Sequence, residues 1–466
     1  MEEKPHIVVV PSAGFTHLVP ILEFSKRLVN LHPQFHITCI IPSIGSPPSS
    51  SKSYLQTLPP TISSIFLPPI NVDQVPDAKI LAVQISLSVK HSLPYIKQEL
   101  ESLCSRSKVV AVVADVFAHD VLDIAKDFNL LCYIYLPQAA MVLSTYFYSS
   151  KLDEILSDES RDPNEPIKVP GCVAFNLKDL PLPFRFRSNI GYTKFLERAE
   201  KYHLFDGVFV NSFLEFEEGA IKGLKEEKKK PMVFPVGPII QKVSIGNENE
   251  VKCLTWLEKQ EPKSVLFVSF GSGGTLSQEQ VNELAYGLEL SGKKFLWILR
   301  SPNGVANATY FVGENEIEDP LRFLPIGFLE RTKEQGLVVP CWGPQIQVLE
   351  HSSTGGFLSH CGWNSVLESV VYGVPVIAWP LFAEQGMNAT LLSDGVKVAL
   401  RPKANEGGLI ERDEIGKVVR ELMDGEEGVE IRKRIEYLKN AANDAINEMG
   451  SSTKALSEVV AIWNGI

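Results

Sequence analysis

The chain has 466 residues, of which 44% are hydrophobic and 22% are charged, and its mean hydropathy is close to zero (+0.03). This composition is typical of a globular protein of about two domains and excludes a disordered chain. The formal net charge of −11 argues against nucleic acid as a partner, because binding a phosphate backbone requires a basic surface.

The start of the chain and the cysteines predict a cytoplasmic protein. Residues 1–5 lead directly into the apolar run "HIVVVP", without the basic start, longer apolar core and cleavage site of a signal peptide. No apolar run approaches membrane-spanning length, so we expect no stable membrane insertion. Seven scattered cysteines without a C-x-x-C pair are typical of reduced thiols.

In the first half, apolar runs alternate with helical patterns, which predicts a parallel sheet wrapped by helices. "HIVVVP" (6–11) precedes a helical run at 17–29, and "FHITCII" (35–41) and "VVAVVAD" (109–115) follow as strands. The proline-rich stretch 163–189 predicts a long functional loop.

The second half repeats this pattern. "SVLFVSFGSGG" reads as a strand and a glycine-rich turn, and Ser277 then caps a helix with Gln280 in the capping-box position. "KFLWILR", "LVVPCW", "GGFLSH" and "PVIAW" read as further buried strands, and "SSTKALSEVVAIWNGI" as a Ser-capped amphipathic helix. We therefore expect an α/β protein with two doubly wound domains, 1–240 and 251–449, a linker at 241–250 and a C-terminal helix at 450–466.

The segment "FLSHCGWNSVLES" (357–369) predicts an anion site, because Gly362 turns an apolar strand into a helix whose first amides point outward. Asn364 and Ser365 can add side-chain donors, and His360 can donate from just before the turn. Glu368 lies one helical turn beyond Asn364, where a carboxylate suits ribose hydroxyls better than phosphate. The segment therefore suggests a nucleotide.

Two other predicted strand ends carry matching chemistry. Trp342 could stack on a base, with Gly343 and Gln345 supplying hydrogen bonds to the base or ribose. Glu384 and Gln385, an acid beside an amide, could hold a polyhydroxylated ring. Each of these residues alone has an ordinary structural explanation, but together they indicate a nucleotide-sugar site. A zinc site at His360 and Cys361 is not expected, because adjacent ligands give poor tetrahedral geometry.

In the first half, His17 lies at the start of a predicted helix and Asp115 ends a predicted strand. The helix dipole disfavours imidazolium, so His17 can act as a base, and Asp115 could orient its ring. Structural roles for both, as a helix-start residue and a turn former, stay open at this point, as does an exchange of roles with His119 or Asp120.

The 44-residue block from Trp342 to Gln385 closely resembles the signature box of plant family 1 UDP-sugar glycosyltransferases. The resemblance extends over the whole chain, including "VVVPSAGFTHLVPILEFSKRL", and is nearest to the hydroquinone (arbutin-forming) glucosyltransferases. It implies the GT-B fold, in which two Rossmann-like domains with parallel sheets face a central cleft and the last helix packs back on the first domain.

The resemblance also implies how the donor is bound. Uracil would stack on Trp342 with a backbone contact from Gly343, and Gln345 and Glu368 would bind the ribose. The pyrophosphate would be bound by Ser272, His360, Gly362, Asn364 and Ser365. The sugar would be bound by Trp363, Glu384 and Gln385. Gln385 together with Trp363 is the pattern associated with glucose, so we expect UDP-glucose as donor.

For catalysis, the resemblance matches His17 and Asp115 to the family's base and its partner. His17 would deprotonate an acceptor hydroxyl that attacks the anomeric carbon with inversion. The sequence has no Asp-x-Asp triplet, which fits a metal-independent enzyme without a cofactor. We expect a monomer with a phenolic acceptor in a pocket whose apolar wall is drawn from Phe117, Tyr146, Phe147, Phe184 and Phe186 and whose entrance Phe15 narrows.

Other enzyme classes fit poorly. A nicotinamide-dependent oxidoreductase needs a glycine-rich first turn, and this one has only Gly14. A serine hydrolase needs a G-x-S-x-G elbow, which the chain lacks. A catalytically silent nucleotide-sugar-binding protein, and an enzyme whose acceptor atom is nitrogen, sulfur or carbon, remain as alternatives.

Overall fold

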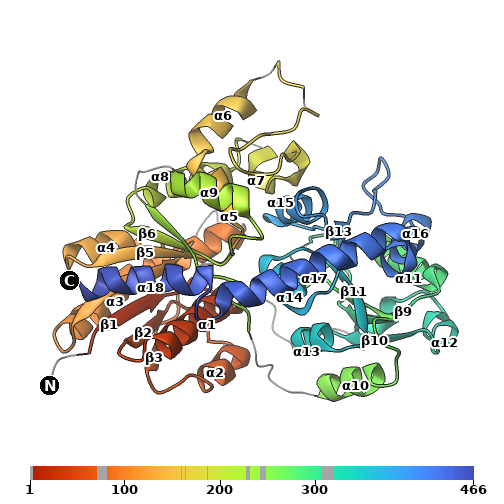
Figure 1. Cartoon of the computed structure of the whole chain (residues 1–466), viewed down its shortest axis with the longest axis horizontal. Helices are drawn as coiled ribbons and strands as arrows, with labels where there is room; N and C mark the ends of the chain where they lie inside the picture. The colour runs from red at the N-terminus through yellow and green to blue at the C-terminus, as the bar shows by residue number, and fades with distance from the viewer. Residues whose placement is uncertain are drawn as a thin grey trace. The chain divides into compact units, whose positions relative to one another are not determined.

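The structure, a computed structural model, describes residues 4–70, 81–158, 160–162, 164–185, 187–226, 231–241, 248–306 and 319–465. The chain forms two compact units (Figure 1). The first unit comprises Met1–Ala174, Pro183–Gln241 and Asp444–Ile466, and the second comprises Phe175–Leu182 and Lys242–Asn443.

The first unit is built on a seven-stranded parallel sheet in the order β3-β2-β1-β4-β5-β6-β7. Its central strands are near-continuous runs of valine, isoleucine and alanine, because both faces of such a sheet are covered by helices. The strands are β1 (His6–Val10), β2 (His36–Ile41), β3 (Ile62–Phe66), β4 (Val109–Asp115), β5 (Leu131–Leu136), β6 (Gly207–Val210) and β7 (Met232–Pro235).

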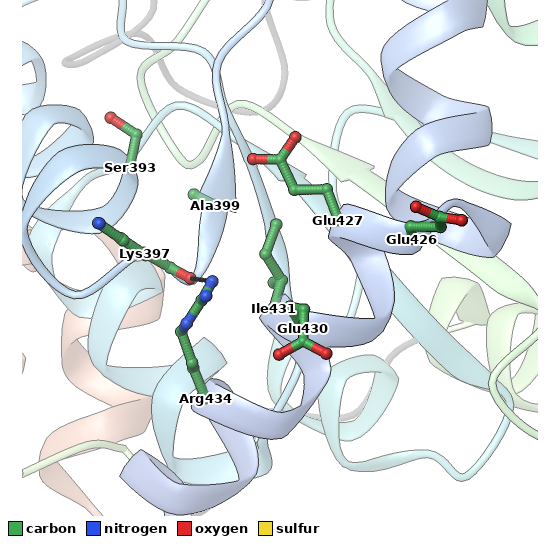
Figure 2. A pocket seen from close by; sticks show the side chains of 8 residues that line it. All are labelled: Ser393, Lys397, Ala399, Glu426, Glu427, Glu430, Ile431 and Arg434. Atoms are coloured by element: carbon green, nitrogen blue, oxygen red, sulfur yellow. Dashed lines mark hydrogen bonds between the residues drawn. The ribbon is translucent and has the colours of Figure 1, made fainter.

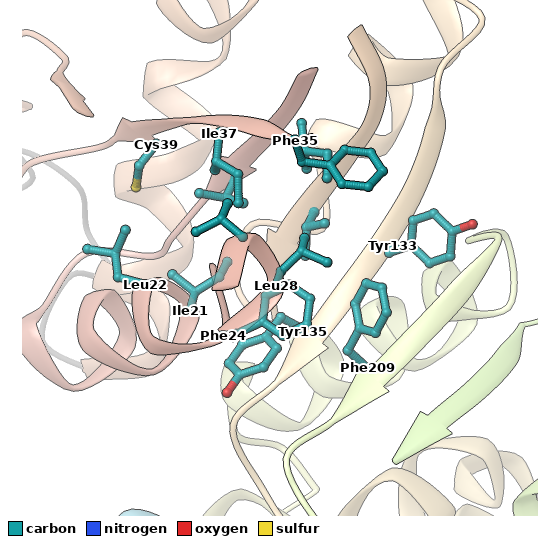
Figure 3. Packing of buried hydrophobic residues seen from close by; sticks show 14 of the residues in the cluster. Ile21, Leu22, Phe24, Leu28, Phe35, Ile37, Cys39, Tyr133, Tyr135 and Phe209 are labelled. Carbon is teal, nitrogen blue, oxygen red and sulfur yellow. The ribbon is translucent and has the colours of Figure 1, made fainter. Parts of the chain in front are cut away.

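The core of the first unit lies between this sheet and the helix that follows β1. Phe24 of that helix packs against Tyr135 and Phe209 from the sheet, with ring centroids 5.1 and 4.8 Å away (Figure 3). The helices in this part of the chain are α1 (Phe15–Leu31), α2 (Ser49–Leu55), α3 (Leu81–Cys104), α4 (Val121–Asp127), α5 (Ala140–Phe147), α6 (Ser149–Ser157), α7 (Leu182–Arg185), α8 (Ile190–Tyr202) and α9 (Glu218–Glu226).

The last helix, α18 (Ser451–Asn464), belongs to the first unit and packs against β7. Its Trp463 is buried edge-on against Phe35 and Tyr133. The prediction of a serine cap is wrong, because the N-cap residue is Gly450 and no side chain caps the helix. The hydroxyl of Ser452 instead donates to the carbonyl of Gly237, a bond that fastens the helix to the unit.

The second unit is built on a six-stranded parallel sheet in the order β10-β9-β8-β11-β12-β13. The predicted Ser277 cap is confirmed, since its hydroxyl accepts from the Gln280 amide at 3.2 Å, but the Gln280 side chain donates to Ile410 instead of closing a capping box. The strands are β8 (Val265–Ser269), β9 (Lys294–Leu299), β10 (Gly336–Pro340), β11 (Thr354–Ser359), β12 (Val376–Ala378) and β13 (Ala399–Leu400).

The helices of this half cover both faces of the sheet, and α11 packs closely against α16. They are α10 (Glu248–Leu257), α11 (Gln278–Ser291), α12 (Phe328–Arg331), α13 (Gln345–Glu350), α14 (Trp363–Tyr372), α15 (Gln385–Thr390), α16 (Arg412–Asp424) and α17 (Glu426–Ile446), with shorter turns η1 (Leu177–Asp179), η3 (Pro320–Phe323) and η4 (Leu391–Gly395).

Both sheets share the doubly wound strand order in which the first strand lies in the middle and the order reverses beside it. This confirms the predicted α/β class with two Rossmann-like, parallel-sheet domains. Among the helices of the described residues, none has the length and apolar character needed to cross a membrane.

The two units differ from the predicted boundaries in two places. Phe175–Leu182 groups with the second unit, although the boundary at 240 placed it in the first, because η1 packs on α15. Residues 444–449 group with the first unit rather than the second, because they lead into α18. Most of the predicted linker, 242–247, lies outside the described residues.

Candidate active site

Some of the predicted site residues lie at the point in each sheet where the strand order reverses, whereas Trp342 follows the edge strand β10 and Glu384 follows β12. In the first sheet this point lies between β1, which Ser12 follows, and β4, which ends at Asp115. In the second it lies between β8, which ends at Ser269, and β11, which His360 follows. Ligands of open α/β sheets bind beyond the carboxyl ends of strands at such reversal points.

In the first unit, the structure brings His17 and Asp115 into contact. His17 lies in the first turn of α1, and its Nδ1 is 3.1 and 3.2 Å from the two carboxylate oxygens of Asp115. The Asp115 side chain is fully buried, whereas 15% of the His17 side chain is exposed. A carboxylate can only accept, so we assign the proton to Nδ1, which leaves Nε2 as the basic nitrogen.

Two further donors hold the Asp115 carboxylate. The Ser12 hydroxyl donates to Oδ2, and the Phe117 amide donates to the same oxygen at 3.3 Å. Sequence reasoning missed Ser12, although its place directly after β1 is the signal that could have found it. With three donors around it, the carboxylate has one orientation in which to hold the imidazole.

The alternative pair of His119 and Asp120 has other neighbours. Asp120 accepts from Lys201 at 2.7 Å, and His119 lies 3.9 Å from Asp120. Burial, followed by the positive charge of Arg198, lowers the pKa of His119 to about 4. A histidine held by an aspartate at hydrogen-bond distance is therefore found at His17 and Asp115, and not at His119 and Asp120.

Three of the predicted acceptor-wall residues belong to one aromatic cluster of the first unit. Phe117 lies edge-on to His17, with ring centroids 5.3 Å apart. Tyr146 and Phe184 both pack on Phe195, at 4.6 and 4.4 Å. Sequence reasoning missed Phe195, whose position on α8 is decided only by tertiary packing.

Arg198, on the same face of α8, was also missed. Its guanidinium lies 4.5 Å from the Phe117 ring and 5.7 Å from the Tyr146 ring. The residue is only 6% exposed, and within the described part of the chain its Nε and Nη1 have no hydrogen-bond partner. A buried cation thus stands against the ring that contacts His17.

The other residues predicted for the acceptor pocket lie elsewhere or are not described. Phe15 packs edge-on to Tyr54 at 6.1 Å, and Phe147 packs against His203 at 4.8 Å. Phe186 lies outside the described residues.

In the second unit, the two predicted ribose ligands contact each other. The Gln345 amide, at the start of α13, donates to Glu368 at 2.6 Å and to Ser365 at 2.8 Å. Glu368 is 7% exposed, and its burial raises the pKa of the carboxyl to about 7. Ser269, whose hydroxyl donates to the Gln345 carbonyl oxygen at 3.4 Å, belongs to the same polar group, which could bind the hydroxyls of a ligand.

His360 is held between two glycines. A Cβ added to Gly271 or to Gly362 would lie 2.5 Å from the His360 ring, so both positions exclude larger residues. Burial, followed by the charge of Arg300, lowers the pKa of His360 to about 4. The ring is therefore neutral at pH 7 and can donate one hydrogen bond to an anion.

The predicted turn from β11 into α14 is present. Gly362 is the N-cap of α14, which begins at Trp363, and no side chain caps its first amides, a position at which helices commonly bind anions. Asn364 is half-buried beside them, while Ser272 is exposed in the turn after β8. Trp363 is buried, so only a small part of its ring can reach a sugar.

Trp342 follows β10 with its indole half-buried. The side chain of Asn249, from α10, donates to the Trp342 carbonyl at 2.9 Å and fixes this turn. Gly343 packs so closely on Ile298 that a Cβ would lie 2.3 Å from the Ile298 side chain. A glycine at 343 therefore suits the local packing of this chain.

Glu384 and Gln385 stand at the start of α15. Glu384 is the N-cap residue, and the Gln385 carbonyl oxygen accepts from the amides of Leu381 and Phe382 at 2.9 and 3.0 Å. These two bonds fix the amide orientation of Gln385, so that its NH₂ group is the one presented to a ligand.

Each of these three turns of the second unit contains a non-glycine residue with left-handed backbone. Cys341 (φ 66°), Cys361 (φ 62°) and Ala383 (φ 53°) precede Trp342, Gly362 and Glu384, respectively. Such residues are uncommon and cluster at ligand sites, where they direct the chain sharply after a strand.

A pocket of about 440 Å³ lies apart from these residues, between η4, β13 and α17 (Figure 2). It is lined by charges of both signs, and Arg434 donates to the Lys397 carbonyl at 3.3 Å. None of the predicted site residues lines it.

Comparisons with known proteins show which family the chain resembles. Residues 239–410 match the family described as UDP-glucoronosyl and UDP-glucosyl transferase. The chain is 48% identical to a hydroquinone glucosyltransferase of Rauvolfia serpentina, over 99% of this chain and 98% of that protein. It is 47% identical to UDP-glycosyltransferase 72B1 of Arabidopsis thaliana, over 99% and 97% of the two chains.

Two solved structures have the same fold over nearly the whole chain. One is UGT2 of Phytolacca americana complexed with UDP-2-fluoro-glucose and pterostilbene (TM-score 0.90, 46% identity, 99% of this chain and 100% of that one). The other is a complex between a UDP-glucosyltransferase from Polygonum tinctorium capable of glucosylating indoxyl and 3,4-dichloroaniline (TM-score 0.91, 44% identity, 100% of both chains). With this identity over its whole length, the chain belongs to the plant UDP-glycosyltransferase family.

Proposed function

We propose that this protein is an inverting, UDP-glucose-dependent glucosyltransferase that glucosylates a phenolic hydroxyl of a small plant metabolite. The observation that carries the proposal is the contact of His17 Nδ1 with the buried Asp115 carboxylate. This contact leaves Nε2 free of the proton and gives the ring a fixed direction, which are the two requirements of a general base.

In the reaction, His17 Nε2 takes the proton of the acceptor hydroxyl while the phenolic oxygen attacks the anomeric carbon of the sugar. The new carbon–oxygen bond forms as the bond to the β-phosphate oxygen breaks, and UDP leaves with the electron pair. Attack from the face opposite UDP turns an α-linked donor into a β-glucoside. Asp115 stabilises the imidazolium that forms.

The donor residues of the second unit supply the charge stabilisation that UDP needs as a leaving group. The amides at the start of α14 point outward with the helix dipole behind them, and His360 and Ser272 add donors. Gln345 and Glu368 would take the ribose hydroxyls, and Trp342 the uracil. These donors can carry the developing charge without a metal ion or a cofactor.

The choice of glucose rests on Glu384 and Gln385. The carbonyl oxygen of Gln385 is occupied by two backbone amides, so its NH₂ group can donate to a sugar hydroxyl while Glu384 accepts from another. An acid and an oriented amide side by side match the alternating donors and acceptors of vicinal hydroxyls.

A phenolic acceptor suits the aromatic cluster beside His17, where the half-buried Phe117 ring lies edge-on to the imidazole. An aromatic amine is a second candidate, favoured by the relative from Polygonum tinctorium whose complex includes 3,4-dichloroaniline.

We also propose that the protein acts as a monomer in the cytoplasm, in keeping with its seven unpaired cysteines.

The test is to mix the purified protein with UDP-glucose and hydroquinone, a flavonol or a chlorinated aniline, with EDTA present and no added metal. UDP release and product mass are followed together. A gain of one hexose on a phenol, with a β linkage by NMR coupling, supports the proposal. UDP-glucose binding without product would favour a catalytically silent binder, and no binding would overturn the donor site.

A further inference from the structure

The proline-rich segment singled out in the sequence has a buried anchor in the second unit. Asp179, the last residue of η1, is 1% exposed, and its Oδ1 accepts from Arg401 Nη2 at 2.6 Å. Its Oδ2 accepts from the Asn176 amide at 3.3 Å and closes a capping box around η1. Both carboxylate oxygens are therefore used.

The same anchor reaches α15, the helix that begins at Gln385. Arg401 Nη1 lies 3.4 Å from the Thr390 hydroxyl, which itself donates to the Gly386 carbonyl at 3.2 Å. A Cβ on Gly386 would lie 2.5 Å from the Asp179 carbonyl oxygen, so the backbone of η1 rests directly on the first turn of α15. Arg401 thus joins η1 and α15 from the end of β13.

We propose that Arg401 and Asp179 are positioning residues for the sugar end of the donor site. The pair holds Phe175–Leu182 against Gly386. It thereby fixes the position of Glu384 and Gln385, which directly precede Gly386 in the chain. This inference rests on the proposed function, because it assumes that these two residues contact the transferred sugar.

Among the ion pairs of the described residues, Arg401 is the one cationic partner of the buried Asp179 carboxylate. A carboxylate that is buried and loses its cationic partner is strongly unfavourable, so η1 leaves its position when Arg401 is removed. A displacement of about 1 Å near a reacting centre is enough to cost a large part of the rate. The residues proposed to bind uracil and ribose lie in the turn after β10, on α13 and on α14, and do not include this pair.

The experiment compares Asp179→Asn, Arg401→Met and Arg401→Lys with the wild-type protein. Asp179→Asn keeps the side-chain volume, and Arg401→Lys keeps the charge. The matched control is Arg412→Met, which breaks another arginine–carboxylate pair of the same unit, with Glu283 between α16 and α11. Each protein is assayed for the ratio of kcat/KM with UDP-glucose to that with UDP-galactose, and for UDP affinity by calorimetry.

We expect the UDP-glucose preference to fall at least tenfold in Arg401→Met and about fivefold in Asp179→Asn, with partial rescue in Arg401→Lys. UDP affinity should stay within twofold of wild type in all of them, and Arg412→Met should keep the preference. The double variant Asp179→Asn/Arg401→Met should lose no more of the UDP-glucose preference than Arg401→Met alone, because the two residues act as one unit.

Two outcomes overturn the inference while leaving the proposed function intact: an unchanged glucose preference in Arg401→Met, or a loss of UDP affinity as large as the loss of preference. A wild-type protein that fails to turn over UDP-glucose at all would instead overturn the proposed function, so the two failures are distinguishable.

Discussion

His17 and Asp115, which are 98 residues apart in the chain, meet at the reversal point of the first sheet with Nδ1 3.1 Å from the carboxylate. Because Asp115 ends β4 and His17 lies in the first turn of the helix after the neighbouring β1, the parallel register of these two strands fixes the contact. The catalytic proposal therefore depends on strand pairing as much as on the two residues.

Replacing His17 by alanine should abolish the glucosylation of ordinary phenols. General-base catalysis typically contributes about 10²–10⁴-fold, so kcat with hydroquinone should fall by that factor. UDP affinity should be nearly unchanged, because the donor residues lie in the other unit. His119→Ala is the control and should keep most of the activity. Equal losses in the two variants, or lost UDP binding in His17→Ala, would show that the base is misplaced.

Replacing Asp115 by asparagine tests the orientation of the ring. The amide nitrogen can donate to Nδ1, which moves the proton to Nε2 and removes the base while the packing is kept. We expect kcat to fall by about 10²-fold or more with little change in acceptor KM. The melting temperature of the variant checks that the hydrogen bonds from Ser12 and Phe117 to residue 115 are kept. An Asp115→Asn enzyme with normal kcat would leave Asp115 with only a structural role.

Glu368 should make stability fall with rising pH. Burial raises its pKa from 4.5 to about 7, so the folded state holds a proton that the unfolded state has lost in this interval. The contribution of the protonated Glu368 to the free energy of unfolding is therefore fully present below about pH 4.5. It is lost as the pH rises to 7, by an amount on the order of 3 kcal/mol.

The check compares the melting temperature of wild type and Glu368→Gln at pH 5, 6, 7 and 8. The wild type should lose stability relative to the variant over this range. Both proteins contain His360, so its effect on stability cancels in the comparison. That effect has the opposite sign: the lowered pKa of His360 makes its contribution to stability fully present above its unfolded pKa of 6.5, and this contribution is lost as the pH falls toward 4. A difference that does not vary with pH would contradict the raised pKa of Glu368.

Gly271→Ala should damage the donor site through His360. A methyl group at this position would lie 2.5 Å from the His360 ring, and the φ of +72° adds backbone strain. Gly292→Ala is a matched control, since Gly292 has a φ of +67° with nothing within 4 Å of the added atom. Both variants should lose about 1 kcal/mol of stability from strain.

Only Gly271→Ala should weaken UDP binding, by about tenfold or more, because it displaces the His360 ring that is proposed to donate to the pyrophosphate. Calorimetric titration with UDP measures this directly. A comparable loss of affinity in Gly292→Ala would mean that strain alone, rather than the contact with His360, is responsible.

Much of the fold and the donor site could be read from the sequence, because their determinants are local. Apolar runs that alternate with helical patterns predict two doubly wound units, and Gly362 marks the turn from β11 into α14. The residues from Trp342 to Gln385 lie within one continuous block, so spacing along the chain already indicates that they serve one ligand.

The sequence alone thus determined which residue types stand at which strand ends, and the nucleotide-sugar chemistry that follows from them. Only the tertiary structure decided the contacts between distant segments: Ser12 on Asp115, Arg198 on Phe117, and Arg401 on Asp179, 222 residues apart. It also separated Phe147 and Phe15 from the aromatic cluster beside His17. The physical reason is that hydrophobic patterning selects strands and helices locally, whereas the partner of a buried charge or ring depends on which elements the sheet order places together.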